Sequence, residues 1–245
     1  MKQPRFFQDI SFQSGERLAL TEQATNHVAR VLRMQAGESI CLFNGQNQEC
    51  LAQLVEVKKR SVMVELGEVV TCSRESSLNL TLVQALSKGD RFDWVVQKAV
   101  ELGVAQLIPV ITERNNVRLD DNKRQKKQAQ WQAIIESASE QCGRNALMQL
   151  SEIMTLTDYL SSKKKADHFV LDPYSKESLM TVMKPSKGAV FLIGPEGGFS
   201  DTEIQKITSS DVQSLRFGPR ILRTETAGIA VCAIAQSLWG DLQPF

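Results

Sequence analysis

The sequence predicts an α/β protein in which a small β unit precedes a larger domain built on a parallel sheet. Before about residue 72 the apolar residues alternate in short runs, as in SVMVEL (61–66), where every second side chain shares a face. Later, apolar runs alternate with stretches of helical period, the strand–helix–strand order of a parallel sheet. The serine-rich segment VTCSRESS (70–77) separates the two patterns, and we place the boundary between residues 72 and 73.

The first part, residues 1–72, carries turn signals at 44–45 and 58–60 and one predicted helix at 21–34. The apolar stripe expected on this helix consists of Ala24, Val28, Val31 and Leu32. Arg30 and Arg33 project together on the other side, beside His27. Such a pair is either a solvated helix face or a phosphate contact. Arg5 in PRFF (4–7) adds a cation next to rings that suit either base stacking or core packing.

The second part, residues 73–245, contains the longer elements. Strands are expected at 78–86, 105–112, 168–172, 189–193 and 214–217, and helices at 90–102, 121–142 and 226–239. Sheets of this kind bind ligands at the carboxyl ends of their strands, so the loops after these strands are the candidate site.

The composition is that of an ordinary globular protein: the chain has 245 residues, of which 42% are hydrophobic and 23% charged, and its net charge is +1. This balance gives no global positive field, so a nucleic-acid surface has to be local. The start of the chain lacks the apolar core of a signal peptide, and no stretch is long enough to span a membrane. We therefore expect a cytoplasmic protein.

Cysteine and histidine usage argues against metal chemistry. The five cysteines are widely spread without a C-x-x-C pair, and there are two histidines, His27 and His168. These counts disfavour a disulfide framework, a zinc site and a histidine-based hydrolase, and we expect no metal. Cys142 falls on the apolar face of its predicted helix, where packing is a better interpretation than a nucleophilic role.

The run VFLIGPEGGFSDTEIQ (190–205) ends a buried-looking strand in a glycine-rich loop. Ser200 and Glu203 have capping-box spacing, so a helix is expected just beyond it. Gly197 and Gly198 permit close backbone approach to a ligand, although a plain strand-to-helix turn also explains them. The loop lacks the Walker and G-x-G-x-x-G patterns, and Glu196 would repel a polyphosphate. S-adenosylmethionine, which carries a positive charge and an adenine edge, fits these residues better.

A second loop, RFGPRILRTETAGIA (216–230), again joins a short strand to a helix through a Gly-Pro turn. Arg220, Arg223 and Glu225 crowd together there. An acid at a helix start is ordinary capping, but capping does not explain two arginines beside it. The arginines are placed for an anionic partner.

The sequence resembles the RsmE-type 16S ribosomal RNA uridine-N3 methyltransferases of the SPOUT class. The matching pieces, in the family's order, are PRFF (4–7), HVARVLRMQAGE (27–38), LSKGDRFDWVVQKAVELGV (86–104), EQCGR (140–144), LIGPEGGFSDTE (192–203) and FGPRILRTETA (217–227). Each of these pieces is weak evidence alone, but the last two, occurring together in this order, are specific to the family. The resemblance implies a PUA-like β-barrel followed by a methyltransferase domain with a trefoil knot. It also implies a homodimer that uses S-adenosylmethionine to methylate 16S rRNA, either naked or within the small ribosomal subunit.

The resemblance carries family roles onto individual residues. The implied cofactor-binding residues are Leu171, Gly194, Pro195, Glu196, Gly197, Gly198, Phe217, Gly218, Leu222 and Thr224. Apart from these family roles, the cations and the histidine nominated for RNA contact are Arg5, His27, Arg30, Arg33, Lys88, Arg144 and Arg220. The departure Tyr174-Ser175 in the first loop leaves side-chain roles there open.

Methylation at uracil N3 requires an unpaired base that loses the N3 proton. Arg223 is the candidate for stabilising the uracil anion, and Glu225 the candidate for accepting the proton. The alternatives are that Arg223 binds RNA phosphate and that Glu225 only caps its helix.

Two other classes remain to be weighed against this interpretation. A non-catalytic ribosome-associated RNA-binding protein would need no cofactor loop, so the two glycine loops argue against it. A nucleotide-binding phosphotransferase is disfavoured by the missing Walker lysine and by Glu196.

Overall fold

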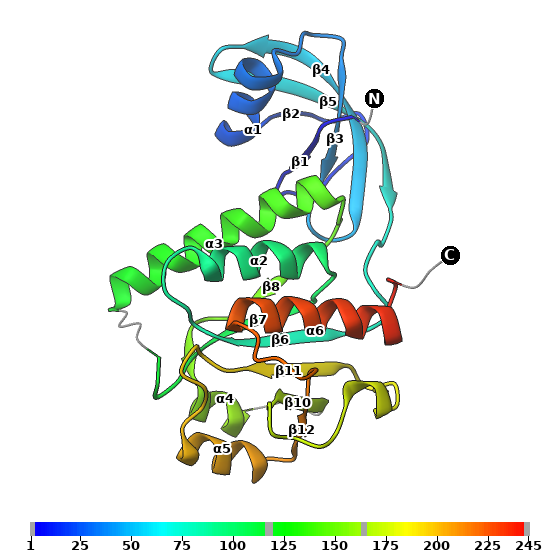
Figure 1. Ribbon diagram of the computed structural model, residues 1–245. Coiled ribbons are helices and arrows are strands. Elements are labelled where there is room, and N and C mark those ends of the chain that lie inside the picture. Colours follow the sequence, from blue (N-terminus) through cyan, green and yellow to red (C-terminus); the bar gives the residue numbers. More distant parts are fainter. Residues whose placement is uncertain (1–2, 116–119, 163–165, 243–245) are drawn as a thin grey trace. The chain divides into compact units, whose positions relative to one another are not determined.

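The computed structural model describes residues 3–115, 120–162 and 166–242. The chain packs as two compact units (Figure 1), one formed by residues 1–75 with 136–147 and the other by 76–135 with 148–245. The end of a long helix therefore packs in the first unit, although it follows part of the second in sequence. The boundary at residues 72 and 73 stays a prediction about where the separately folding domains meet.

The first unit is a five-stranded sheet in the order β1-β3-β4-β5-β2. Its strands are β1 (Arg5–Phe7), β2 (Arg17–Ala19), β3 (Ser39–Phe43), β4 (Gln48–Lys58) and β5 (Ser61–Thr71). β1 pairs with β3 in parallel and the other pairings are antiparallel. Val62, Val64 and Leu66 are at most 1% exposed. The predicted alternation in 61–66 is thus confirmed, and it turns one face of β5 into the core.

The predicted helix at 21–34 is two elements, α1 (Glu22–Asn26) and the π-helical turn η1 (His27–Leu32). Ala24 and Val28 are buried as expected, but Val31 is 68% and Leu32 41% exposed, so the prediction of one apolar stripe is wrong for these two. The wider π turn changes the spacing of side chains around the helix, and the Met34 amide donates to the Val28 carbonyl at 3.0 Å. Two apolar side chains consequently stand in solvent beside Arg30 and Arg33.

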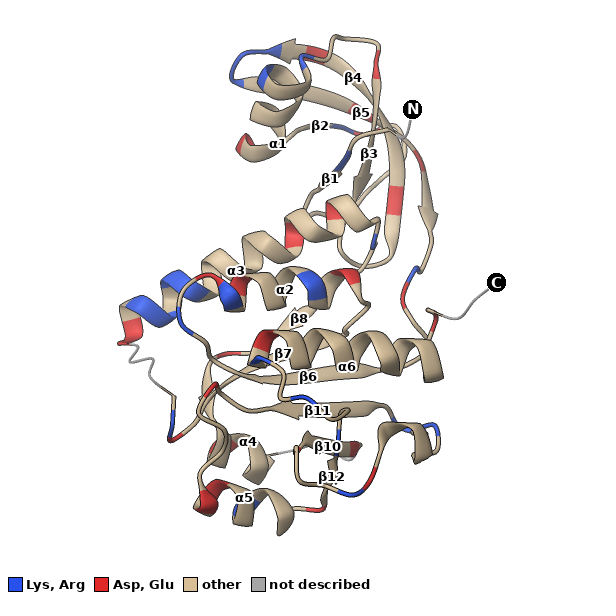
Figure 2. Ribbon diagram, in the orientation of Figure 1, with Lys and Arg blue, Asp and Glu red and all other residues tan. Residues whose placement is uncertain are grey.

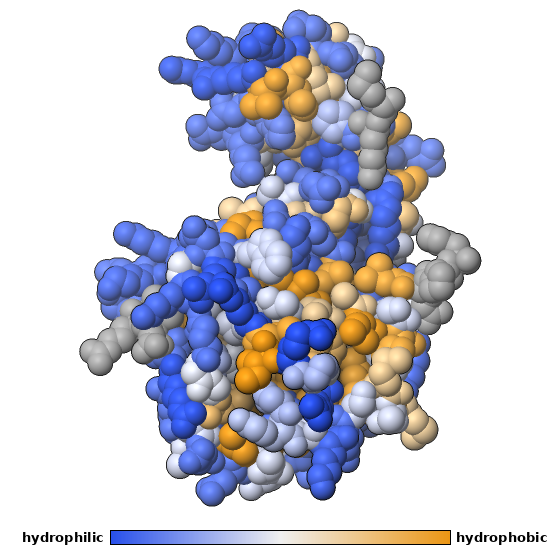
Figure 3. Space-filling model, viewed as in Figure 1, coloured by the Kyte–Doolittle hydropathy of each residue, from blue (hydrophilic) through white to orange (hydrophobic). Residues whose placement is uncertain are grey.

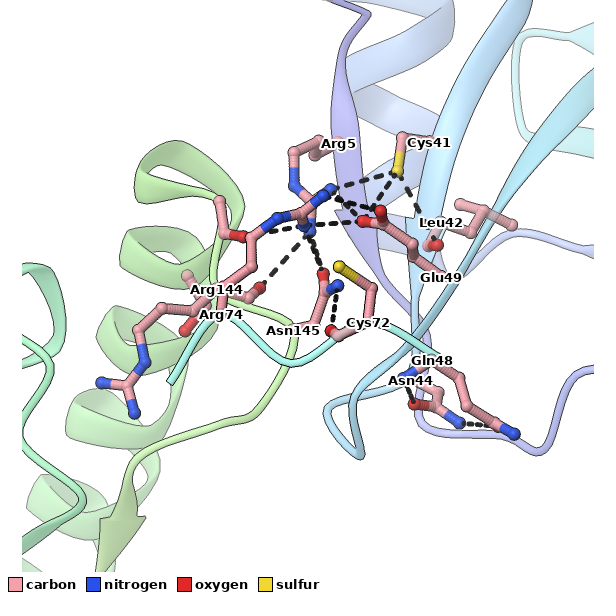
Figure 4. A network of polar contacts seen from close by, with 12 residues as sticks. Arg5, Cys41, Leu42, Asn44, Gln48, Glu49, Cys72, Arg74, Arg144 and Asn145 are labelled. Carbon is pink, nitrogen blue, oxygen red and sulfur yellow. Dashed lines mark hydrogen bonds and ion pairs between the residues drawn. The ribbon is translucent and has the colours of Figure 1, made fainter. Parts of the chain in front are cut away.

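Glu49 on β4 is the centre of a polar cluster within the first unit (Figure 4). Arg5 donates to the Glu49 carboxylate at 2.7 Å and to Asn145 Oδ1 at 2.6 Å. Arg74 donates to both Glu49 oxygens, at 2.7 and 2.6 Å. Hydrogen bonds from Arg74 and then from Arg5 lower the pKa of Glu49 to about 2. The cluster ties β1 and β4 to the segments after β5 and after the long helix.

Glu49→Gln is expected to lower the free energy of unfolding by about 2–3 kcal/mol, since two guanidinium groups then face a neutral amide. The folded pKa of about 2 lies below the ordinary 4.5, so the carboxylate's stabilisation is present above that ordinary value and is lost as pH falls toward the folded pKa. Urea denaturation over a pH series should therefore show a shallower acid loss for the variant. Equal pH slopes would contradict this role. Glu65→Gln, which breaks the exposed Arg17–Glu65 pair, is the matched control and should cost under about 1 kcal/mol.

The second unit is a parallel sheet of seven strands in the order β12-β10-β11-β6-β7-β8, with β9 also paired to β7. The strands are β6 (Leu80–Ala85), β7 (Gln106–Ile111), β8 (Gln149–Leu150), β9 (Met154–Thr155), β10 (Asp167–Leu171), β11 (Ala189–Ile193) and β12 (Val212–Leu215). The helices are α2 (Arg91–Glu101), α3 (Asp121–Cys142), α4 (Leu156–Ser162), η2 (Leu179–Thr181), α5 (Asp201–Thr208) and α6 (Thr224–Trp239). The predicted α/β class with a parallel sheet is confirmed.

Some boundaries differ from the predicted ones. The last strand spans 212–215 rather than 214–217, so Phe217 lies in the loop that follows it. Helix α6 begins at Thr224, two residues earlier than expected, and α4 was not predicted because its seven residues are too few to show a clear helical period. The corrections place Phe217 and Thr224 at the carboxyl edge of the sheet, where parallel strands present their loops.

Candidate active site

Thr224 joins three elements at the carboxyl edge of the sheet. Its hydroxyl donates to the Gly194 carbonyl at 2.6 Å and accepts from the Gln84 side-chain amide at 2.8 Å. Thr224 and Gln84 are 5% and 1% exposed, so both hydrogen bonds are made away from water. One buried side chain therefore fixes the end of β6, the start of the glycine loop and the first turn of α6 against one another.

The glycine loop after β11 is a tight turn followed by the predicted capping box. The Gly198 amide donates to the Pro195 carbonyl at 2.9 Å, and Gly198 has φ +69. A Cβ on Gly198 would meet nothing within 4 Å, so open space lies beside it. Ser200 and Glu203 exchange the two capping-box hydrogen bonds, which confirms that prediction. The loop thus presents backbone to an open region, as a ligand cradle must.

Two arginines that sequence reasoning missed hold the outer side of this loop. Arg91, the first residue of α2, pairs with the Glu196 carboxylate at 2.7 Å. Arg114, after β7, donates to the Gly197 carbonyl at 3.2 Å. Arg91 begins α2 after β6, the strand paired with β11, and Arg114 follows β7, the next strand of the sheet, so only the strand order could have revealed these contacts. The charge of Glu196 is consequently balanced by a neighbouring cation.

A pocket of about 260 Å³ opens beside the loop after β12. Its lining includes Leu179, Met180, Phe217, Gly218, Leu222 and Ile234, together with Arg216 and Arg220. Three predicted cofactor residues, Phe217, Gly218 and Leu222, thus come together with apolar side chains from η2 and α6. Mostly apolar walls with few polar groups suit a flat heteroaromatic ring or a thioether.

Leu171 ends β10, where it is half-buried and paired in register with Leu215 of β12. The next loop is tied to β12, because the Ser175 hydroxyl donates to the Ser214 carbonyl at 2.8 Å. Tyr174 is 89% exposed. The departure from the family noted at 174–175 therefore puts a serine in a structural contact and a tyrosine in solvent.

Arg223 and Glu225 flank Thr224 in different environments. Arg223 is exposed and occupies the N-cap position of α6, but its side chain makes no capping hydrogen bond. Glu225 is 8% exposed, and its Oε2 has no hydrogen-bond partner within the described residues. A buried acceptor without a partner is costly unless a ligand or a proton satisfies it. Together with the open glycine loop, this atom shows that the residues present fit a bound ligand.

The cations nominated for RNA contact fall into two groups. His27, Arg30, Arg33, Lys88 and Arg220 are exposed. The side chains of Arg5 and Arg144 are each 7% exposed and ion-paired, with Glu49 and Glu75 respectively. Their geometry is that of structural ion pairs, and RNA contact by these two stays an untested prediction.

Within the described ranges, no group of three or more His, Cys, Asp and Glu side chains is arranged to hold a metal ion. None of the helices in that part of the chain combines the length and apolar character needed to cross a membrane.

Comparison with known families matches both units. The model of the RNA methyltransferase domain matches residues 74–236, and that of the RNA methyltransferase PUA domain matches residues 20–66. Fold and site together define a two-domain RNA methyltransferase with a PUA-like unit.

Individual relatives narrow the class. The Bacillus subtilis protein named ribosomal RNA small subunit methyltransferase E is 32% identical, over 94% of this chain and 95% of its own length. A solved protein of that name from Neisseria gonorrhoeae, bound to S-adenosyl methionine, is 37% identical with a TM-score of 0.94, covering 98% of this chain and all of the other. A Legionella pneumophila protein solved with the bound cofactor SAM is 41% identical with a TM-score of 0.95, covering 99% and 100%. The chain belongs to the ribosomal RNA small subunit methyltransferase E family, and the resemblance stated from its motifs is confirmed.

Proposed function

We propose that this protein transfers a methyl group from S-adenosylmethionine to N3 of a uridine in 16S ribosomal RNA. The proposal rests on the buried hydrogen bonds of Thr224 with Gly194 and Gln84. These bonds hold the loop after β11 and the loop after β12 together at the carboxyl edge of the sheet, where a ligand would bind. Family membership and the ligand in two solved relatives support the same cofactor. The names of the curated relatives support small-subunit ribosomal RNA as substrate.

The cofactor would be held by the loops after β10, β11 and β12. We assign its apolar contacts to Leu171, Phe217 and Leu222, and its backbone contacts to residues 194–198 and Gly218, with Thr224 fixing the loop. When bound, S-adenosylmethionine supplies an electrophilic methyl group. The remaining requirements fall on the chain: hold the uracil, exclude water and remove one proton.

Arg223 and Glu225 are proposed to act on the uracil. Uracil N3 loses its proton as it becomes the nucleophile, and the negative charge spreads onto O2 and O4. The exposed guanidinium of Arg223 would stabilise that charge, and the unpartnered Glu225 carboxylate oxygen would accept the proton. The alternative is that Arg223 binds an RNA phosphate. The rate of methyl transfer by Arg223→Ala at saturating RNA, given in the Discussion, distinguishes the two roles.

The exposed cations His27, Arg30, Arg33, Lys88 and Arg220 are proposed to dock the RNA backbone. Contacts to phosphate position an RNA without selecting a base, and each contributes about one unit or somewhat less to the salt dependence of binding. Ribosomal RNA, and hence this activity, is expected in the cytoplasm.

A homodimer is the proposed assembly. The outer face of α6 carries Ala227, Ala230, Ala233 and Ile234 and no charge, and apolar side chains gather over this helix in Figure 3. Met180, Met183 and Ile221 are 68%, 89% and 83% exposed. A surface this apolar is typical of a self-association interface.

Sedimentation velocity should give twice the mass of one chain. The double variant Met183→Glu/Ile234→Glu should shift it to one.

Two measurements test the proposed function. Nuclease digestion and mass analysis of ribosomal RNA from cells with and without this protein should show the loss of one N3-methyluridine from 16S RNA. In vitro, S-adenosylhomocysteine should raise the melting temperature and ATP should not. The reverse thermal pattern would identify a nucleotide-binding enzyme. An unchanged RNA with no response to either ligand would identify a non-catalytic RNA-binding protein.

A further inference from the structure

Trp94 is a large aromatic side chain left in solvent on α2. The chain has three tryptophans, and Trp131 and Trp239 are 2% and 4% exposed, whereas Trp94 is 47% exposed. The core-facing residues of α2 are Phe92, Val95, Val96, Ala99 and Val100. Trp94 lies on the opposite, solvent-facing side, so its ring does not serve the packing of this helix.

Trp94 lies one helical turn after a residue that contacts the glycine loop. Arg91, three residues before Trp94 on the same helix, pairs with Glu196 of that loop at 2.7 Å. Residues three apart on a helix are neighbours, separated by about 4.5 Å along the axis. Lys88, in the segment between β6 and α2, is also exposed. The solvent side of α2 therefore carries an open ring next to Arg91, whose charge is paired with Glu196, and the exposed Lys88 lies just before the helix. Figure 2 shows basic and acidic residues together at the start of this helix.

We propose that Trp94 is a stacking platform for a nucleotide that flanks the methylated uridine, with Arg91 as the adjacent cation. This inference rests on the proposed function. A uracil that offers N3 has left its base pair, so the neighbouring nucleotides are single-stranded and need new stacking partners. Single-stranded RNA is commonly held by aromatic rings beside Arg or Lys, which contact the phosphates.

Charge favours RNA over a second copy of the chain as the occupant of this surface. Arg91 is paired with Glu196, so the positive charge available to a polyanion comes from the exposed Lys88, before α2, and from the exposed Arg114, which contacts the glycine loop. The core of a protein interface is poor in charge and contiguous in apolar area. The outer face of α6 has that character, whereas Trp94 is a single ring among polar neighbours.

The test measures RNA binding by fluorescence anisotropy with a labelled single-stranded RNA of about twelve uridine-rich nucleotides. Trp94→Ala should weaken binding about tenfold, and Trp94→Phe, which retains a ring, within about threefold. Gln97→Ala is the matched control: an exposed residue on the same helix with neither ring nor charge, for which no change is expected. In the wild type, the same RNA without a label should quench tryptophan emission, because Trp94 alone among the three tryptophans is exposed.

Normal RNA affinity of Trp94→Ala, or emission that RNA does not change, overturns the inference. So does a loss of dimer mass in Trp94→Ala, which would place the ring between two copies of the chain. Single-turnover methylation by the wild type separates the inference from the function it rests on. If the wild type transfers methyl groups while Trp94→Ala binds RNA normally, only the platform is wrong. If RNA binding depends on the ring but no methyl transfer occurs, the proposed function is wrong and the RNA platform stands.

Discussion

Gly198→Val is expected to weaken S-adenosylmethionine binding by about 30-fold or more while the protein remains folded. Gly198 has φ +69 and closes the turn from Pro195, a conformation that costs an L-residue about 1–2 kcal/mol and a β-branched one more. The valine is therefore expected to pull the turn into another conformation, and each 1.4 kcal/mol of this strain costs about tenfold in affinity. Titration calorimetry gives the affinity, and circular dichroism reports whether the fold is intact.

Gly15→Val is the matched control for this prediction. Gly15 also has positive φ, +80, with nothing within 4 Å of its added Cβ, but it lies in the first unit. This control should lower the melting temperature without changing cofactor affinity. If both variants bind the cofactor equally well, the turn at 195–198 is not part of the cofactor site.

Local sequence patterns predicted those features of the fold that depend on local periodicity. Alternation identified β5, helical spacing identified α2, and the pairing of Ser200 with Glu203 located the start of α5. The π turn at 27–32 escaped prediction because helical spacing assumes a constant number of residues per turn. That assumption assigned Val31 and Leu32 to a core they do not enter.

The sequence predicted which loops form the candidate site, but not which distant residues contact those loops. Glycine, proline and charge marked the loops after β11 and β12 directly. The contacts of Glu196 with Arg91 and of Gly197 with Arg114 span 105 and 83 residues, and no local pattern encodes them. Arg5 looked available for RNA for the same reason, since its partner Glu49 lies 44 residues away. Pairings between distant segments follow from strand order, which the sequence pattern does not specify.

Arg223→Ala is expected to lower the single-turnover rate of methyl transfer about 100-fold with RNA and cofactor saturating. Removal of one donor that faces developing charge typically costs about 10²–10³ in rate. Arg223 adjoins Thr224, whose hydroxyl is fixed to Gly194, so its backbone is anchored while its side chain stays exposed. Rapid-quench methylation at increasing RNA concentration measures the rate at saturation.

Arg30→Ala/Arg33→Ala is the contrasting variant. Arg30 lies in the π turn of the first unit and Arg33 is the exposed residue that ends it. Loss of both should weaken RNA binding and reduce its salt dependence by about one unit of log–log slope per phosphate contact removed. Saturating RNA should restore the rate of this double variant but not that of Arg223→Ala, because a contact made equally with free and reacting RNA alters affinity alone. Arg223→Lys distinguishes the charge of this side chain from its geometry. The point charge of a lysine suffices to bind a phosphate, whereas the two-pronged guanidinium of arginine suits uracil O2 or O4 together with the atoms next to that oxygen. Full rescue of Arg223→Ala by saturating RNA would make Arg223 a docking residue and leave the uracil anion without its proposed stabiliser.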